Sequence, residues 1–140
     1  MTDRGARLLW VVLTAAALIG FAALLVGCAS LGPVTPVAVS DLGSVVGRWQ
    51  GVVYGPGSEP EYVALTIRED GSYDLVSRQQ IGESRGSGKI VLRNGRLLLD
   101  GPRGHGVGTV MINAAGNRVM NIEATLSDNR TVTAELSSSR

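Results

Sequence analysis

Hydrophobic and polar residues divide the chain into two parts with different patterns. Residues 8–26 form an apolar run in which 17 of 19 side chains are apolar and none is charged. From about residue 45 onward, apolar and polar positions alternate instead, in segments separated by Gly-, Asn- and Asp-containing turns. This period of two is typical of half-buried β-strands, and no stretch beyond residue 45 keeps the 3.6-residue spacing of an amphipathic helix.

The alternating segments predict eight strands. Asp70-Gly71 and Asn94-Gly95 each lie between two alternating runs, which predicts type I′ hairpins because both central residues of that turn need positive φ. The predicted strands span residues 46–54, 62–68, 72–79, 86–93, 96–100, 106–113, 118–126 and 131–137.

Short strands in sequence must protect their edges, and an up-and-down barrel does so with nearest-neighbour connections only. We therefore predict an all-β domain, an eight-stranded antiparallel up-and-down barrel, with a two-sheet β-sandwich as the alternative. Connections in such a barrel alternate between its ends, so the longer segments 55–61, 80–85, 101–105 and 127–130 would form a mouth. The inward face is predicted to carry Trp49, Val53, Val63, Leu65, Ile67, Tyr73, Leu75, Ile90, Leu92, Leu97, Leu99, Val110, Ile112, Met120, Ile122, Val132, Ala134 and Leu136.

The apolar run is preceded by Arg4 and Arg7 and ends in Leu25-Val26-Gly27-Cys28. This arrangement resembles the signal peptide and lipobox of bacterial lipoproteins. The resemblance implies that residues 1–27 are a lipoprotein signal peptide and that Cys28 is the lipid attachment site, carrying a covalent diacylglycerol and an N-acyl chain. Two or more acyl chains anchor a protein firmly. The alternative is an uncleaved membrane anchor in which Cys28 has no role.

Both alternatives place the domain outside the cytoplasm, in the cell envelope, because the basic residues precede the apolar run. Ala29 and Ser30 follow the cysteine. In the lipoprotein family an Asp at the first of these positions favours retention in the inner membrane, so the resemblance favours the outer membrane in a cell with two membranes. The membrane is thus the first expected partner.

Residues 28–44 would be the acylated N-terminus and a flexible tether, since residues 29–44 contain Pro33 and Pro36 and one charge. The barrel domain would span residues 45–140. Near its start, Gly47-Arg48-Trp49 is similar to the G-x-W signature of lipocalins and related calycins. The resemblance covers about residues 45–137 and implies a lipocalin-like barrel in which the tryptophan packs across the closed end.

Composition narrows the chemistry. The chain has 13 basic and 12 acidic side chains, a net charge of +1, one His and one Cys. This balance argues against nucleic acid as a partner, because phosphate binding needs a clustered basic excess. One Cys and one His cannot form a disulfide or a four-ligand zinc site, so we expect no metal.

No catalytic constellation is recognisable. His105 is the only imidazole, and residues 101–108 are glycine-rich but lack the Lys-Ser/Thr of a phosphate-binding loop. We therefore predict no catalytic residues and no cofactor besides the covalent lipid, with an uncharacterised hydrolase as the alternative to a non-enzymatic protein.

The predicted mouth supplies the candidate binding residues Arg85, Arg103, His105 and Arg130, which acidic side chains oppose there. Arginine favours planar contacts at interfaces. An eight-stranded barrel has an interior that side chains fill or that holds one small ligand. The inward glycines, Gly47, Gly51, Gly88 and Gly108, would either leave a cavity or permit strong coiling of the strands.

Two functional hypotheses follow. The first is a membrane-anchored envelope lipoprotein whose barrel is a binding or interaction module for an envelope protein or a glycan. The alternative is a lipocalin-like carrier or sensor of a small apolar ligand.

Overall fold

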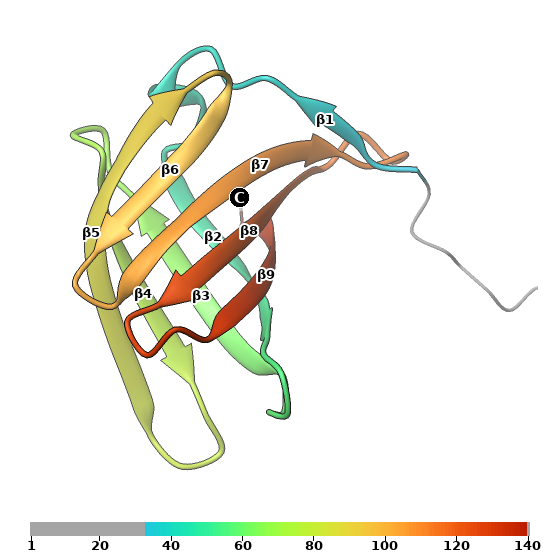
Figure 1. Ribbon diagram of the computed structural model, residues 1–140. Helices are drawn as coiled ribbons and strands as arrows, with labels where there is room; N and C mark the ends of the chain where they lie inside the picture. Colours follow the sequence, from blue (N-terminus) through green and yellow to red (C-terminus); the bar gives the residue numbers. More distant parts are fainter. Residues whose placement is uncertain (1–32, 140) are drawn as a thin grey trace, which may run out of the picture. The chain divides into compact units, whose positions relative to one another are not determined.

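The computed structural model describes residues 33–139, which form one antiparallel sheet of nine strands and one short helical turn (Figure 1). The all-β prediction is confirmed. The elements are β1 (Thr35–Val37), the 3-10 helix η2 (Leu42–Val45), β2 (Gly47–Tyr54), β3 (Glu61–Ile67), β4 (Ser72–Arg78), β5 (Glu83–Arg93), β6 (Arg96–Gly101), β7 (Gly104–Ile112), β8 (Arg118–Leu126) and β9 (Thr131–Ser139).

The strands β2 to β9 close into a barrel. Each pairs with its sequence neighbours, β2 pairs with β9, and β7 pairs with β8, so every one of the eight has two hydrogen-bonded neighbours. This closure excludes the two-sheet sandwich. The predicted strand positions agree with the observed ones apart from their ends, and β5 begins three residues earlier than predicted, at Glu83.

The two hairpin predictions have different outcomes. Asn94 and Gly95 both have positive φ, 52° and 74°, as a type I′ turn requires. In the other hairpin only Gly71 has positive φ, 78°, and its N–H donates to the Arg68 carbonyl oxygen. That pattern is a type I turn followed by a left-handed glycine, so the type I′ prediction at Asp70-Gly71 is wrong. The Asp70 carboxylate accepts from the Ser72 N–H at 2.9 Å, and this hydrogen bond holds the Asp70 backbone at a negative φ.

The core lies inside the barrel and contains most of the predicted inward residues. Those that are buried are Trp49, Val63, Leu65, Ile67, Ile90, Leu97, Leu99, Val110, Met120, Ile122, Ala134 and Leu136, and a further set including Val53, Tyr73, Leu75 and Leu92 packs against them. Val132 is half-buried and is not among these residues. Ile112 is a second exception, since it is 37% exposed. It follows the part of β7 that pairs with β6 and pairs with Thr35 of β1 instead, beyond the core.

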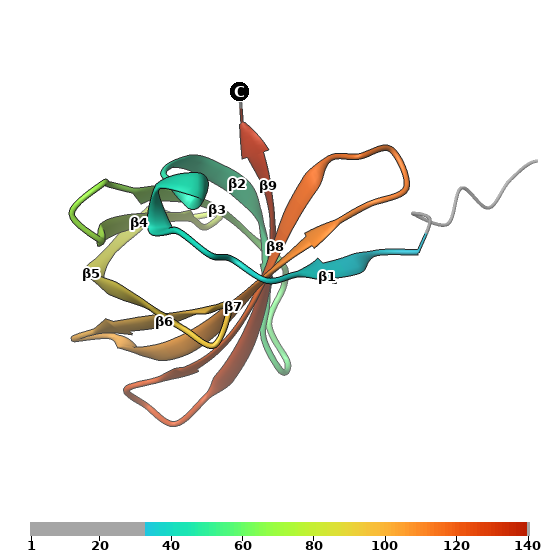
Figure 2. The same ribbon diagram turned by 90° about the horizontal axis from the view of Figure 1, so that it is seen from above.

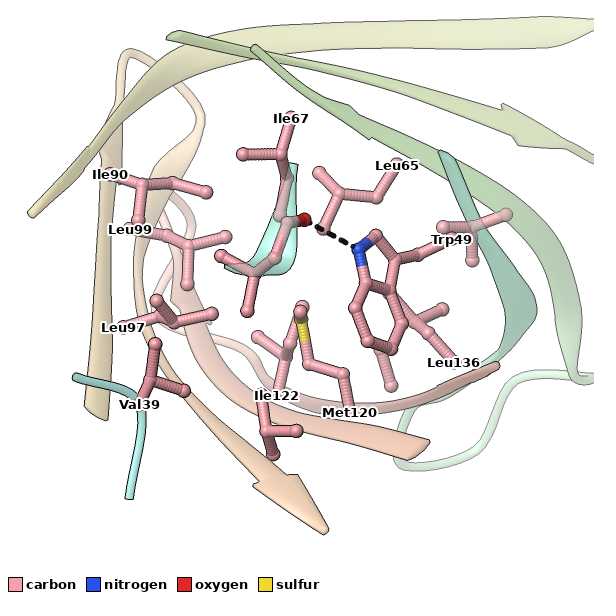
Figure 3. Close-up of a cluster of buried hydrophobic side chains, with 14 residues drawn as sticks. Val39, Trp49, Leu65, Ile67, Ile90, Leu97, Leu99, Met120, Ile122 and Leu136 are labelled. Atoms are coloured by element: carbon pink, nitrogen blue, oxygen red, sulfur yellow. Dashed lines mark hydrogen bonds between the residues drawn. The ribbon is translucent and has the colours of Figure 1, made fainter. Parts of the chain in front are cut away.

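One end of the barrel is closed by η2 and Trp49. The indole Nε1 of Trp49 donates to the Val45 carbonyl oxygen at 2.9 Å, and both residues are buried (Figure 3). The guanidinium of Arg118 lies 5.8 Å from the centre of the indole ring and donates to the Ser44 carbonyl oxygen. The tryptophan of the G-x-W pattern therefore lies at the closed end, and Gly47 before it has a φ of 127° that favours glycine.

The folded part of the chain begins before Val45. Within the segment for which a tether was predicted, β1 pairs with the end of β7, and Val39 is 6% exposed among the core residues. The Val39 N–H donates to the Gly95 carbonyl oxygen at 3.0 Å. Residues 35–45 are thus attached to the barrel, and the compact unit extends from Pro33.

Residues 1–32 and 140 lie outside the described part of the chain. The predicted signal peptide, Cys28 and the first residues of the predicted tether fall in this range. Among residues 33–139, no helix has the length and apolar character needed to span a membrane.

Candidate functional site

The end of the barrel opposite Trp49 contains a cavity of about 200 Å³. Its rim is formed by the connections 55–60, 79–82, 102–103 and 127–130, which are the predicted mouth segments with adjusted ends. The walls are apolar side chains from five strands: Val53, Leu75, Leu99, Ile122, Leu126 and Val132.

The cavity exists because inward positions near this end carry small residues. Five small residues line it at inward-facing positions of strands that also carry large core residues: Ser77, Gly86, Gly106, Ala124 and Ala134. A Cβ added to Gly86 would meet nothing closer than 3.5 Å, so this position leaves room for a methyl group at ordinary contact distances.

The glycines predicted to face inward do not make the cavity. A Cβ on Gly51 would lie 1.8 Å from the Glu135 carbonyl oxygen, and one on Gly88 would lie 2.1 Å from the Asp100 carbonyl oxygen. These two glycines permit close approach of neighbouring backbones, as strong coiling requires. The coiling interpretation therefore holds for Gly51 and Gly88, and different glycines line the cavity.

A carboxylate stands on one side of the rim. Glu61, the first residue of β3, accepts from the Ser77 hydroxyl at 2.6 Å and from the Gln79 Nε2 at 3.0 Å. Ser77 is 8% exposed, the one polar side chain among the buried residues of the described chain. Because each carboxylate oxygen accepts more than one hydrogen bond, Glu61 retains acceptor capacity toward the cavity.

Arg103 bounds the cavity on another side. It projects from the β6–β7 turn toward β5, where its Nη1 donates to the Ser84 hydroxyl and to the Arg85 carbonyl oxygen, the latter at 2.9 Å. Its Cδ lies 3.5 Å from the place a Cβ would take on Gly86. The Arg103 carbonyl oxygen accepts from the Ser127 N–H at 3.0 Å, which joins two rim turns. The side chain is thereby held against β5 at the edge of the opening.

Tyr73 lines the cavity from β4. Burial raises the pKa of its hydroxyl, and the charge of Asp100 adds to the shift. The hydroxyl is therefore neutral at physiological pH and can both donate and accept a hydrogen bond. The ring occupies the space beside Gly88, since its Cε1 lies 2.7 Å from the position of an added Cβ there.

The four predicted mouth residues do not all reach this site. Arg103 and Arg130 line the cavity, and Arg130 forms an ion pair with Asp128 at 2.7 Å. His105 borders the cavity, but its neighbours Gly106 and Gly108 are the buried positions of β7, so the alternation directs the imidazole outward.

Arg85 lies outside the cavity. The early start of β5 places Arg85 within the strand, next to the inward position of Gly86 rather than in a loop. Its guanidinium pairs with Glu83 at 2.8 Å and lines a groove on the outer surface instead. The prediction of Arg85 at the mouth is therefore not supported by its position.

Three polar groups of the site were not singled out as binding residues by the sequence pattern: Glu61, Ser77 and Tyr73. Ser77 offered a signal, because it occupies an inward position of β4 where the alternation calls for an apolar residue. A polar side chain at such a position needs a partner, and Glu61 supplies it from the adjacent strand.

Among residues 33–139, no group of three or more His, Cys, Asp or Glu side chains is arranged to hold a metal ion. The site thus offers a carboxylate, a guanidinium and hydroxyls around an apolar hollow.

No protein-family model, no curated protein and no solved structure was found to match the chain. The closed antiparallel barrel agrees with the fold that the G-x-W pattern implied, and strand pairing alone establishes it.

Proposed function

We propose that this protein is a non-enzymatic, membrane-anchored lipoprotein of the cell envelope whose barrel is a binding module with its binding site in the open-end cavity. The cavity of about 200 Å³, with apolar walls and a polar rim, is the observation that supports this proposal. The lipid anchor at Cys28 rests on the lipobox resemblance.

The cavity favours a small apolar ligand over a flat contact with a protein or glycan. Its volume exceeds the roughly 150 Å³ that holds benzene in an engineered core and is below the roughly 300 Å³ of a small drug pocket. The ligand class is therefore one or two fused rings or a short branched chain, and a polar end on such a ligand would be directed to Glu61 or Arg103 at the rim. An envelope protein that inserts one apolar side chain would use the same hollow.

Native mass spectrometry of full-length protein extracted from membranes tests both parts of the proposal. We expect an N-terminus at Cys28 that carries acyl chains, and a bound small molecule that leaves on gas-phase activation. An unmodified chain that begins at Met1 would contradict the anchor. A domain that carries no small molecule and binds no small apolar probe would contradict the carrier function.

A matched pair of variants locates the site. Ala124 lines the cavity, whereas Ala64 lies on the outer surface of β3. We expect Ala124→Leu to fill the hollow and weaken binding of naphthalene, followed by its fluorescence, by at least about tenfold, a loss on the scale of one well-packed apolar group. Ala64→Leu should leave the affinity unchanged. Equal naphthalene affinities of the two variants would show that the binding site lies elsewhere. A protein that binds a partner protein but does not retain naphthalene would be an interaction module instead of a carrier of small ligands.

A further inference from the structure

The chain enters the barrel at its closed end. The register pairs Val37 with Val110, and residues 38–39 lie against the turn at Gly95, so the segment before η2 crosses this end (Figure 2). Cys28 precedes Thr35 by seven residues. At no more than about 3.6 Å per residue, these residues span at most about 25 Å. A lipid on Cys28 therefore keeps the closed end near the membrane surface.

The closed end also carries four of the five arginines of residues 33–139 that lack carboxylate partners; the fifth, Arg103, lies at the open end. Within residues 33–139, Arg93, Arg96, Arg48 and Arg118 form no ion pair. Arg93 and Arg96 stand directly opposite each other across the β5–β6 hairpin. Like charges in that arrangement repel, so binding of an external anion would stabilise the pair.

The carboxylates at this end do not cancel the excess. Asp74 pairs with Arg68, and Asp70 lies 3.6 Å from Lys89. Asp41, Glu69 and Asp100, which stands opposite Lys89 in the register, are the further acids there, which leaves six basic side chains against five acidic ones. Near the open end, by contrast, Arg78, Arg85 and Arg130 all have carboxylate partners.

Exposed apolar side chains lie beside the unpaired arginines. Val34 is 45% exposed, and Val37 and Ile112 are each 37% exposed. Ile112 is the register partner of Arg118, which caps the closed end over Trp49. Apolar groups rimmed by arginine suit the interface of a bilayer, where the former enter the headgroup region and the latter contact phosphates.

We infer that the closed end docks on an anionic lipid surface, so that the barrel stands on the membrane with its cavity facing away. This inference rests on the proposed membrane anchor. Each basic side chain near an anionic surface strengthens docking by about fivefold at physiological salt. The attraction reaches about one Debye length, roughly 8 Å, so the short connection to Cys28 is needed for it to act.

A fluorophore at each end of the full-length protein tests the inference. Ala115→Cys labels the closed end and Ile81→Cys the open end, where Ile81 is 92% exposed. In vesicles of phosphatidylcholine and phosphatidylglycerol, we expect the closed-end label to be at least about threefold less quenched by acrylamide than in phosphatidylcholine alone. The open-end label should be quenched equally in both. Salt at 0.5 M should remove the difference.

Charge reversal supplies the matched control. Arg93→Glu with Arg96→Glu should abolish the protection, whereas Arg78→Glu with Arg85→Glu, on the outer surface near the open end, should not. Equal quenching of the closed-end label in the two lipid mixtures, or protection of the open-end label instead, would overturn the inference. Labelling of the wild-type chain tests the anchor separately. A lipidated Cys28 has no free thiol and should not react with the fluorophore, whereas labelling at Cys28 would contradict the anchor.

Discussion

The two halves of the barrel interior share one backbone pattern and differ in the size of the side chains that point inward. Toward the closed end, Leu65, Leu97, Met120 and Leu136 are fully buried in the cluster that contains Trp49 (Figure 3). Toward the open end, serine, glycine and alanine take the equivalent positions, and a cavity of about 200 Å³ remains. Alternation makes the wall of a barrel, and residue volume decides whether the wall encloses a core or a binding site.

The difference also separates stability from function. Large side chains that fill the closed half contribute most of the buried apolar area, and burying one stabilises the fold by about 1.5–3 kcal/mol. The open half contributes less packing and keeps its polar groups at the rim, where Glu61 and Arg103 are held by neighbouring side chains and backbone. Substitutions in the two halves should therefore change the free energy of unfolding by different amounts.

The largest effect is expected at the closed end. Trp49→Ala removes a buried side chain and its hydrogen bond to Val45, which should lower the free energy of unfolding by about 3–5 kcal/mol. Tyr62→Ala, at a 72% exposed aromatic, should change it by less than about 0.5 kcal/mol. Urea titration followed by circular dichroism measures both. Similar losses for the two variants would show that the closed half does not dominate stability.

Two glycines on β5 give the next largest contrast. Gly88→Ala places a Cβ 2.1 Å from a backbone oxygen and should cost about 1–3 kcal/mol of unfolding free energy. Gly86→Ala, two residues toward the open end, meets only contacts of 3.5 Å or more and should stay within about 0.5 kcal/mol. Thermal and urea unfolding distinguish them, and a Gly86→Ala variant as unstable as Gly88→Ala would mean that the open half is packed as tightly as the core.

The smallest expected effect is on the pH dependence of the unfolding free energy, through one carboxylate in a turn at each end of the barrel. Hydrogen bonds from the Ser72 hydroxyl and N–H, with the charge of Lys89, lower the pKa of Asp70 to about 2 from an ordinary value of 3.8. A depressed carboxyl pKa stabilises the fold above about pH 4, and this contribution is lost as pH falls to 2. Asp70→Asn should therefore flatten the dependence of unfolding free energy on pH in that range.

The carboxylate Asp128, in a turn at the open end, provides the comparison with Asp70. Hydrogen bonds from the side chain and backbone of Arg130 lower the pKa of Asp128, so Asp128→Asn should flatten the pH dependence in the same direction. Both carboxylates are exposed, and salt weakens the contribution of their charges. Unfolding curves recorded from pH 5 to 2 measure the slopes, and a wild-type slope in Asp70→Asn would refute the closed-end contribution.

Sequence patterning predicted most of the barrel, because each strand repeats a period of two over enough residues to define its inward face. It located the strand ends less well. The early start of β5 moved Arg85 from the predicted mouth to the outer surface, since one position along a strand exchanges the two faces. It also missed β1, a three-residue strand with a proline that is held only by pairing with β7.

By itself, the sequence determined that the domain is all-β, that its inward face is apolar, and that an uncharged apolar run at residues 8–26 precedes Cys28. These features are local, so neighbouring residues suffice to read them. Closure of β2 on β9, the attachment of residues 35–45 and the meeting of Glu61 with Ser77 depended on the tertiary structure. Each joins residues on different strands, and register and coiling of the whole barrel decide which small side chains leave the open end hollow.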